Sequence, residues 1–178
     1  MRPRLLVALI VAVLVSGTSC ASEGDSDVEV PAGPEGTQTY TDLTFQHVDA
    51  FVEYPQTPPV GGDHWSVWQT CAVYDQPVQP ELAVHSMEHG AVWITYAPDL
   101  DASQVDVLVA LAEAGDKVLL SPFEGLPSPV VASAWGKQVV LGSATDRRLA
   151  EFLAAFDNGP QAREPNGPCT DGITATPP

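Results

Sequence analysis

Basic residues are scarce in this chain. Its 178 residues contain 7 Lys and Arg against 23 Asp and Glu, which gives a formal net charge of −16. A chain this acidic is repelled by phosphate backbones and anionic lipid surfaces, so the composition argues against nucleic acid and against direct membrane binding. The same charge is compatible with cation binding, although an acidic surface also serves solubility alone.

Hydrophobic runs long enough to cross a membrane are missing too. The run Leu5–Val15 has 11 apolar residues, which is too short for a membrane span but matches the hydrophobic region of a signal peptide. Arg2 and Arg4 supply the basic residues that precede such a region. We therefore expect residues 1–20 to be a signal peptide and the protein to be exported.

The residues after this run offer two alternative sites for cleavage of the signal peptide. Cys20 stands where a lipobox has its cysteine, which predicts a lipoprotein on the outer side of the cytoplasmic membrane, held there through its lipid only. Gly17 replaces the usual aliphatic residue of a lipobox, and cleavage after Ala21 would instead give a secreted protein. If Cys20 is the first residue, 159 residues remain, with 5 Lys and Arg against 23 Asp and Glu and a formal charge of −18.

Cysteine is rare, with three in the whole chain. Besides Cys20 there are Cys71 and Cys169, and no Cys-x-x-Cys pair occurs. Two spare cysteines in an exported protein usually pair, so we predict a disulfide that ties the C-terminal tail to the middle of the domain. A closed loop of roughly 100 residues would contribute ~4–5 kcal/mol in the chain-entropy account. The alternative is two free thiols, one of them a metal ligand.

Two recurrent catalytic motifs are absent as well. The sequence has no Gly-x-Ser-x-Gly elbow and no phosphate-binding loop. The protein is therefore more consistent with a binding role than with an enzyme. Acid–base chemistry by Glu88 and a histidine remains an open alternative.

The chain does have a cluster of ligand-type side chains in residues 84–90. Half of its four histidines, His85 and His89, lie four residues apart with Met87 and Glu88 between them. Imidazole, carboxylate and thioether groups are common ligands of transition metals. Because the β-prone run Ala91–Tyr96 follows directly, we predict a metal site in a loop or at the edge of a strand.

The spacing His-x-x-Glu-His also matches a zinc-peptidase motif, in which one helix presents both histidines. Pro77 and Pro80 come shortly before the motif and Gly90 directly after it, so the sequence predicts a loop here and not a helix. A hydrolase is accordingly the remote alternative.

A metal site needs a third ligand, and His64 is the natural candidate. It lies on a segment stiffened by proline and rich in glycine, close to Cys71. Together with His85 and His89, and with Glu88 in support, it would suit copper or zinc, for carriage of the metal rather than catalysis. His47 is predicted to be an ordinary strand histidine.

The competing interpretation needs no metal. In it, His85, Glu88 and His89 form a buried hydrogen-bond network with Tyr74 or Trp93, and the protein is a structural or interaction module outside the cytoplasm.

Tyr54, Trp65 and Trp68 lie on or next to the loop rich in proline and glycine. Aromatic side chains on a stiff loop are expected to pack over something rather than to float in solvent. They form a candidate binding loop for a protein, peptide or glycan partner at the cell surface.

The periodicity of the remaining chain predicts one α+β domain. Apolar residues at helical spacing predict two helices, one capped by Asp101 or Ser103 and one by Thr145 or Asp146. Strands are expected within 41–52 and 71–74, and at 91–96, 117–121, 129–135 and 138–141. The result would be a two-layer domain with a mostly antiparallel sheet covered by two helices, part of it in a split β-α-β arrangement, after long N-terminal loops rich in proline and glycine.

Four segments make up the expected domain organisation. Residues 1–20 are the signal peptide, and 21–39 form a disordered acidic linker. Residues 40–160 form the α+β domain, and 161–178 are a tail tied by the predicted disulfide.

Five separated segments resemble the DUF3105 family of bacterial, often exported or membrane-attached proteins. The family pattern has Ser, Gly and Leu where this chain has Gly61, Ala72 and Met87, and the aliphatic family residue indicates that the thioether of Met87 packs rather than ligates. The resemblance covers roughly residues 40–160 and implies no particular reaction. The segments are Pro58–Trp65, Cys71–Tyr74, Val84–Val92, Ala134–Gly136, and Phe152 with Asn158–Pro160.

Overall fold

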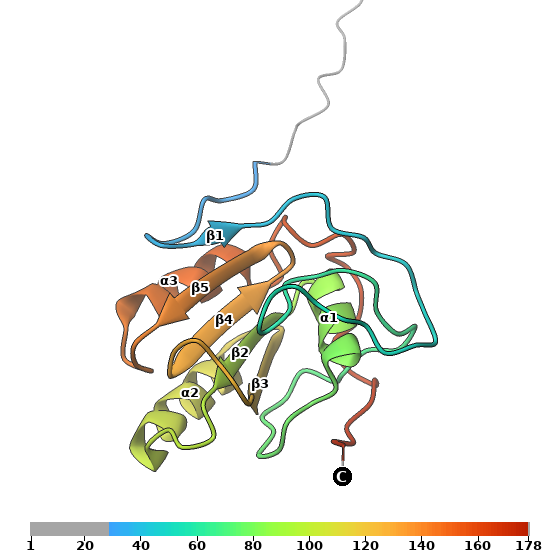
Figure 1. Cartoon of the computed structure of the whole chain (residues 1–178). Helices are drawn as coiled ribbons and strands as arrows, with labels where there is room; N and C mark the ends of the chain where they lie inside the picture. Colours follow the sequence, from blue (N-terminus) through green and yellow to red (C-terminus); the bar gives the residue numbers. More distant parts are fainter. Residues whose placement is uncertain (1–28, 178) are drawn as a thin grey trace, which may run out of the picture.

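The computed structural model describes residues 29–177 (Figure 1). Cys20, the expected signal peptide and residues 21–28 of the expected linker lie outside this range. Among the described residues, no helix is both long enough and apolar enough to cross a membrane. The described chain is an α+β domain, as the sequence predicts, and it is built on one five-stranded sheet.

Across the sheet, the strands follow the order β1-β5-β4-β2-β3. Neighbouring strands are antiparallel except β2 and β3, which are parallel. The four longer strands lie where the sequence predicts them. The strand bounds are β1 Gln38–Thr39, β2 Val92–Tyr96, β3 Val118–Pro122, β4 Val130–Ala134 and β5 Lys137–Leu141.

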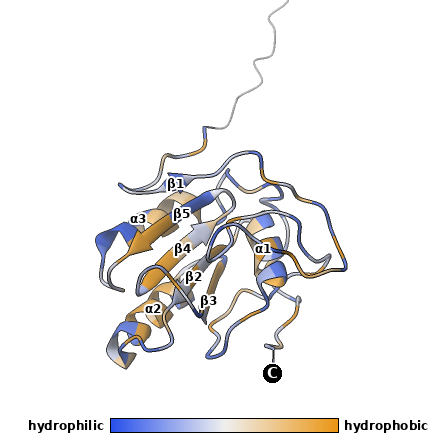
Figure 2. Cartoon of the chain, in the orientation of Figure 1, coloured by the Kyte–Doolittle hydropathy of each residue, from blue (hydrophilic) through white to orange (hydrophobic). Residues whose placement is uncertain are grey.

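Helices α2 (Ala102–Ala114) and α3 (Arg147–Phe156) cover one face of the sheet (Figure 1). Asp101 precedes α2 and Asp146 precedes α3, where its carboxylate accepts a hydrogen bond from the backbone N–H of Arg148 at 3.0 Å. Figure 2 shows hydrophobic residues along the strands, with hydrophilic residues at the N-terminal end of α3. Both predicted helices are therefore confirmed, and each buries its apolar stripe against the sheet.

The link through α2 differs from the expected split arrangement. β2 and β3 are direct neighbours, so β2-α2-β3 is a simple crossover between adjacent parallel strands. Side chains of β2 alternate between the two faces. Ile94 packs on the α2 and α3 side, whereas Trp93 packs on the opposite side.

A third helix, α1 (Pro80–Glu88), covers this opposite face, where the sequence predicts a loop. The loop prediction for residues 84–88 is wrong for a physical reason. Pro80 occupies the first turn, where a helical N–H has no partner and proline is tolerated. Eight of the nine residues of α1 are buried, and its polar positions Glu81, His85 and Glu88 fall at helical spacing but are covered by other parts of the chain instead of by solvent. Gly90, with a φ of +99°, ends it.

Three short segments also depart from expectation. Residues 41–52 form no strand, and their pairing is limited to an isolated bridge between His47 and His64. Residues 71–74 contribute one bridge, from Val73 to Leu120. β1 lies inside the expected linker and pairs with β5. Propensity alone misjudges such short pieces because tertiary contacts decide them.

The predicted disulfide is confirmed. Cys71 and Cys169 are bonded across 98 residues, and the backbone N–H of Cys71 donates to the carbonyl of Cys169 at 2.8 Å. Lys117, directly before β3, holds the same C-terminal segment. Its ammonium donates to the carbonyls of Pro165 and Gly167, each at 2.8 Å. The segment therefore lies against the domain beside the C-terminal end of α1.

Candidate metal site

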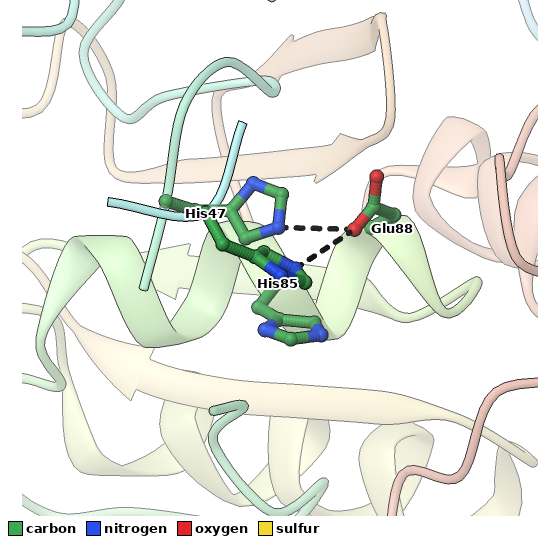
Figure 3. Close-up of side chains that lie close together, drawn as sticks. His47, His85 and Glu88 are labelled. Carbon is green, nitrogen blue, oxygen red and sulfur yellow. Dashed lines mark ion pairs between the residues drawn. The ribbon is translucent and has the colours of Figure 1, made fainter. Parts of the chain in front are cut away.

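The candidate site lies at the C-terminal end of α1, on the sheet face opposite α2 and α3. His85 and Glu88 are three residues apart, so the helix presents both on one side. Figure 3 shows the imidazole of His47 and the carboxylate of Glu88 facing each other beside α1, with His85 close to both. The backbone of His64 bridges to the backbone around His47, with a bond from the N–H of Val48 to the carbonyl of His64 at 2.8 Å.

Four side chains converge here from three segments. The ligand-type atoms of His47, His64, His85 and Glu88 all lie within 4.8 Å of one another. His64 Nε2 lies 3.0 Å from Glu88 Oε2, and His47 Nε2 lies 3.9 Å from the same oxygen. His64 is fully buried and His85 and Glu88 almost so, whereas the side chain of His47 is half exposed. The cluster is thus a buried group with one member at the surface.

Main-chain carbonyls fix the orientation of three imidazoles. A carbonyl only accepts hydrogen bonds, so each Nδ1 bonded to one must carry its hydrogen. In a neutral ring, Nε2 is then the atom with a free lone pair, which is the form that binds metals. The three bonds run from His64 to Gly62 at 2.8 Å, from His85 to Trp65 at 2.7 Å and from His89 to Pro168 at 2.7 Å.

This arrangement makes acceptor atoms face one another. His64 Nε2 faces the carboxylate of Glu88 at 3.0 Å, and His85 Nε2 faces His89 Nε2 at 3.1 Å. Among the described residues, the buried Nε2 of His64 has no hydrogen-bond partner. Two acceptors at such a distance need a cation between them, either a proton on one imidazole or a metal ion shared by both.

Burial affects the protonation of His85. Burial lowers the pKa of this imidazole most, the bond to the Trp65 carbonyl raises it, and the neighbouring His64, His89 and His47 lower it. The net result is a pKa lowered from 6.5 to about 4. His85 is therefore neutral at pH 7, which is the state that a metal ligand requires.

Arg163 compensates the buried charge of Glu88. Its Nε lies 3.4 Å from Glu88 Oε1, whereas His64 approaches Oε2, and its guanidinium stacks on the ring of Phe45 at 3.5 Å from the centroid. Glu88 therefore has one oxygen directed to the histidines and the other to a cation.

The sequence-predicted set and the observed cluster overlap but differ. His64, His85 and Glu88 lie together, whereas His89 is outside the four-residue cluster, next to His85 and 3.6 Å from Glu164 Oε2. His47 takes a place in the cluster that its sequence context does not suggest, because it belongs to an irregular segment without periodicity. The rarity of histidine in this chain is the one sequence signal that could have drawn attention to it.

The predicted aromatic loop packs around the same site. Trp68 lies with its ring 5.7 Å from that of His85 and 5.1 Å from that of His89. The indole N–H of Trp65 donates to the carbonyl of Ala50 at 2.9 Å. The hydroxyl of Tyr54 donates to the backbone carbonyl of Asp63 at 2.7 Å. These polar groups are therefore satisfied within the chain, and the rings of Trp65 and Trp68 are only partly exposed.

Fold and site together define a class: a small α+β domain that buries a histidine–carboxylate group able to hold a metal ion. The chain belongs to the DUF3105 family, whose description is protein of unknown function and whose sequence profile matches residues 47–171. The matched range begins at His47 and contains all four histidines and both disulfide cysteines. No curated protein and no solved structure matches the chain.

Proposed function

We propose that this protein binds one transition-metal ion, zinc or copper, between His64, His85 and Glu88, with His47 as the fourth ligand at the surface. The role is carriage or storage of the ion outside the cytoplasm. The protein would be exported and anchored through a lipid on Cys20, or secreted if it is cleaved after Ala21.

One observation carries this proposal. Nε2 of His64 and Oε2 of Glu88 face each other at 3.0 Å while Nδ1 of His64 is committed to the Gly62 carbonyl. One metal ion would accept the lone pairs of His64 Nε2, Glu88 Oε2 and His85 Nε2 together. Around a tetrahedral ion with bonds of about 2.0–2.1 Å, the ligand atoms lie about 3.3 Å apart. The cluster spans up to 4.8 Å, so binding requires a modest contraction, and the half-exposed His47 is the member freest to move.

The ligand set limits the choice of metal. Imidazole and carboxylate groups suit Zn²⁺ and Cu²⁺, whereas Cu⁺ prefers sulfur ligands. Cys71 and Cys169 are bonded to each other, and Met87 is buried in the apolar cluster beneath α1. We therefore expect divalent ions to bind more tightly than Cu⁺.

The competing function is an interaction or structural module in which a proton replaces the metal. A protonated His64 would pair with Glu88 at the observed distance. The cluster would then serve the stability of the fold, and the partly exposed rings of Trp65 and Trp68 would be the surface offered to a partner.

Calorimetric titration of the chelator-stripped protein with Zn²⁺ and Cu²⁺ at pH 7 separates the two functions. We expect one ion per chain, and a melting temperature that rises with free metal concentration because the ion binds the folded state only. His85→Asn is the matched variant. The amide nitrogen of asparagine takes the place of Nδ1, so the bond to the Trp65 carbonyl is kept while Nε2 is lost.

Affinity should fall at least about tenfold in this variant with the fold retained, and His64→Asn should behave alike. No heat and no thermal shift with either metal would exclude the metal function and favour the module.

A further inference from the structure

His85 lies between two groups of ligand atoms. On one side are His47, His64 and Glu88, all within 4.8 Å of it. On the other side is His89, whose Nε2 lies 3.1 Å from that of His85. The single lone pair on Nε2 of His85 can bind only one ion at a time. Any ion held on the His89 side therefore competes with an ion in the inner cluster.

The ring of His89 is held with Nε2 directed to His85. Its Nδ1 donates to the carbonyl of Pro168 at 2.7 Å, and that carbonyl is fixed by the disulfide of the next residue, Cys169. Gly167 lies so close that a Cβ there would collide with the imidazole. His89 is 4% exposed, and its Nε2 faces an acceptor rather than a donor. This is an oriented, nearly buried lone pair that faces another lone pair.

Glu164 extends the His89 side to the surface. Its carboxylate lies 3.6 Å from His89 Nε2, and its side chain is 61% exposed. Its backbone N–H donates to the carbonyl of Glu88 at 2.9 Å, which holds the residue at the end of α1. The three groups His85, His89 and Glu164 therefore lead from the buried cluster to solvent.

We propose that His85, His89 and Glu164 form a second, outer metal position that shares His85 with the inner one, and that Zn²⁺ or Cu²⁺ enters and leaves through it. This inference rests on the proposed function of the inner cluster. The separation of 3.1 Å between the two imidazole nitrogens is close to that of two ligands on one tetrahedral ion, about 3.3 Å. An ion that moves inward keeps His85 and exchanges His89 and Glu164 for His64 and Glu88, so it is never released to water during transfer.

The two-position arrangement predicts that changes at the outer position slow the uptake and release of the ion but leave the dissociation constant nearly unchanged. We would measure Zn²⁺ uptake, and Zn²⁺ release to a chromophoric chelator, by stopped flow on the full mature chain. In Glu164→Gln and His89→Asn, both rates should fall at least about tenfold while the dissociation constant stays within about threefold, because the inner ligands are intact. His89→Asn keeps a donor for the Pro168 carbonyl. Glu113→Gln, an exposed charge change on α2, is the control and should leave the rates unchanged.

The outer position can also be observed directly. In His64→Asn, which weakens the inner position, residual Co²⁺ binding should show the visible bands of an imidazole-ligated ion. A second change, His89→Asn, should remove them.

The outcomes are distinguishable. If the unaltered chain binds no Zn²⁺, the proposed function fails and this inference with it. If it binds but Glu164→Gln and His89→Asn keep its rates, the outer position is wrong and the inner site stands. If either variant lowers the affinity as strongly as His85→Asn, the residues belong to one site and the two-position arrangement is overturned.

Discussion

At the scale of single residues, three main-chain carbonyls decide what the histidines can do. Each carbonyl accepts a hydrogen bond from Nδ1 of one imidazole and so fixes its tautomer. The pairs are Gly62 with His64, Trp65 with His85, and Pro168 with His89. The chemistry of the site therefore depends on backbone atoms at distant points of the chain. A substitution that keeps these bonds but removes Nε2 tests ligation, whereas one that removes the whole ring also tests packing.

The depressed pKa of His85 predicts a pH dependence of stability in the metal-free protein. Its pKa is about 4 in the folded state against 6.5 in the unfolded state, so between these values the unfolded state binds more protons. The stability that depends on neutral His85 is thus complete above about pH 6.5 and is lost as the pH falls towards 4. Allowing for solvent screening, we expect the free energy of unfolding to fall by about 1–2 kcal/mol across this window.

Urea unfolding of the metal-free protein at pH 7 and pH 4.5 measures this effect, with His85→Asn as the control. Titrating groups remote from His85 contribute equally to both proteins, so the difference between them isolates His85 together with its coupling to the neighbouring histidines. Identical pH slopes in the two proteins would contradict the predicted shift.

Lys117 offers a second test at this scale. Its ammonium donates to three carbonyls, those of His89, Pro165 and Gly167, each at 2.8 Å. Lys117→Met leaves these acceptors without a donor beneath the C-terminal segment, and we expect a loss of about 2–4 kcal/mol in the free energy of unfolding. Lys137→Met, which removes one exposed bond to Thr39, should cost less than about 0.5 kcal/mol. Denaturant titration compares the two, and equal costs would refute the role assigned to Lys117.

At the scale of elements, the sequence predicts well the amphipathic helices and the β-prone runs that turn residues separate. α2 and α3 have one apolar stripe each, so the helical periodicity locates them. The four longer strands are β-prone runs, and the turn residues at their ends mark their limits. α1 defeats the same method because it is only nine residues long and because Pro77 and Pro80, near its start, indicate a loop, although proline is tolerated in the first turn of a helix. The candidate site could be predicted in part, through the dense motif at His85 and Glu88. His47 could not, because the irregular backbone around it has no period.

Met87 tests how α1 is held. It is fully buried in the cluster formed with Val84, Trp93 and Leu119. Met87→Leu nearly conserves volume and should cost less than about 1.5 kcal/mol, whereas Met87→Ala leaves a cavity and should cost about 2–5 kcal/mol. Thermal and urea unfolding measure the costs, and metal affinity in Met87→Leu should be unchanged. A large loss of affinity in the leucine variant would show that the thioether ligates.

At the scale of the whole molecule, the C-terminal segment closes the domain over the site. It supplies Arg163 to Glu88, Glu164 to His89 and the Pro168 carbonyl to the same imidazole. The Cys71–Cys169 disulfide fastens it. The tail that the sequence suggests is merely tied down is therefore one wall of the site.

Removing the disulfide tests this closure. In Cys71→Ala/Cys169→Ala, a loop of 98 residues is opened, and the chain-entropy account predicts a loss of about 4–5 kcal/mol in the free energy of unfolding. Amide hydrogen exchange should quicken in residues 163–169 more than in α2 or α3. Uniform exchange across the domain, or a cost below about 1 kcal/mol, would show that the segment is held without the bridge.

The lipid anchor is a prediction about the part of the chain outside the described residues. Cys20→Ser should move the protein from the membrane fraction to the soluble fraction, because the thioether-linked lipid is its expected membrane contact. Cell fractionation with intact-mass measurement checks this, and a conservative Ser16→Thr variant is the control. A native chain without lipid that begins at Ser22 would establish secretion instead.

The order of the site residues along the chain also determines when the site can be completed during synthesis. His47 is its first contributor and Pro168 among its last, with more than a hundred residues between them. A nascent chain still partly on the ribosome, or partly threaded through a translocation channel, lacks the wall that the C-terminal segment provides. The bond between Cys71 and Cys169 forms only where the surroundings are oxidising. In an exported protein, as proposed above, maturation would therefore end after synthesis and delivery, and the finished site would meet the ions of its destination rather than those of the compartment where it was translated.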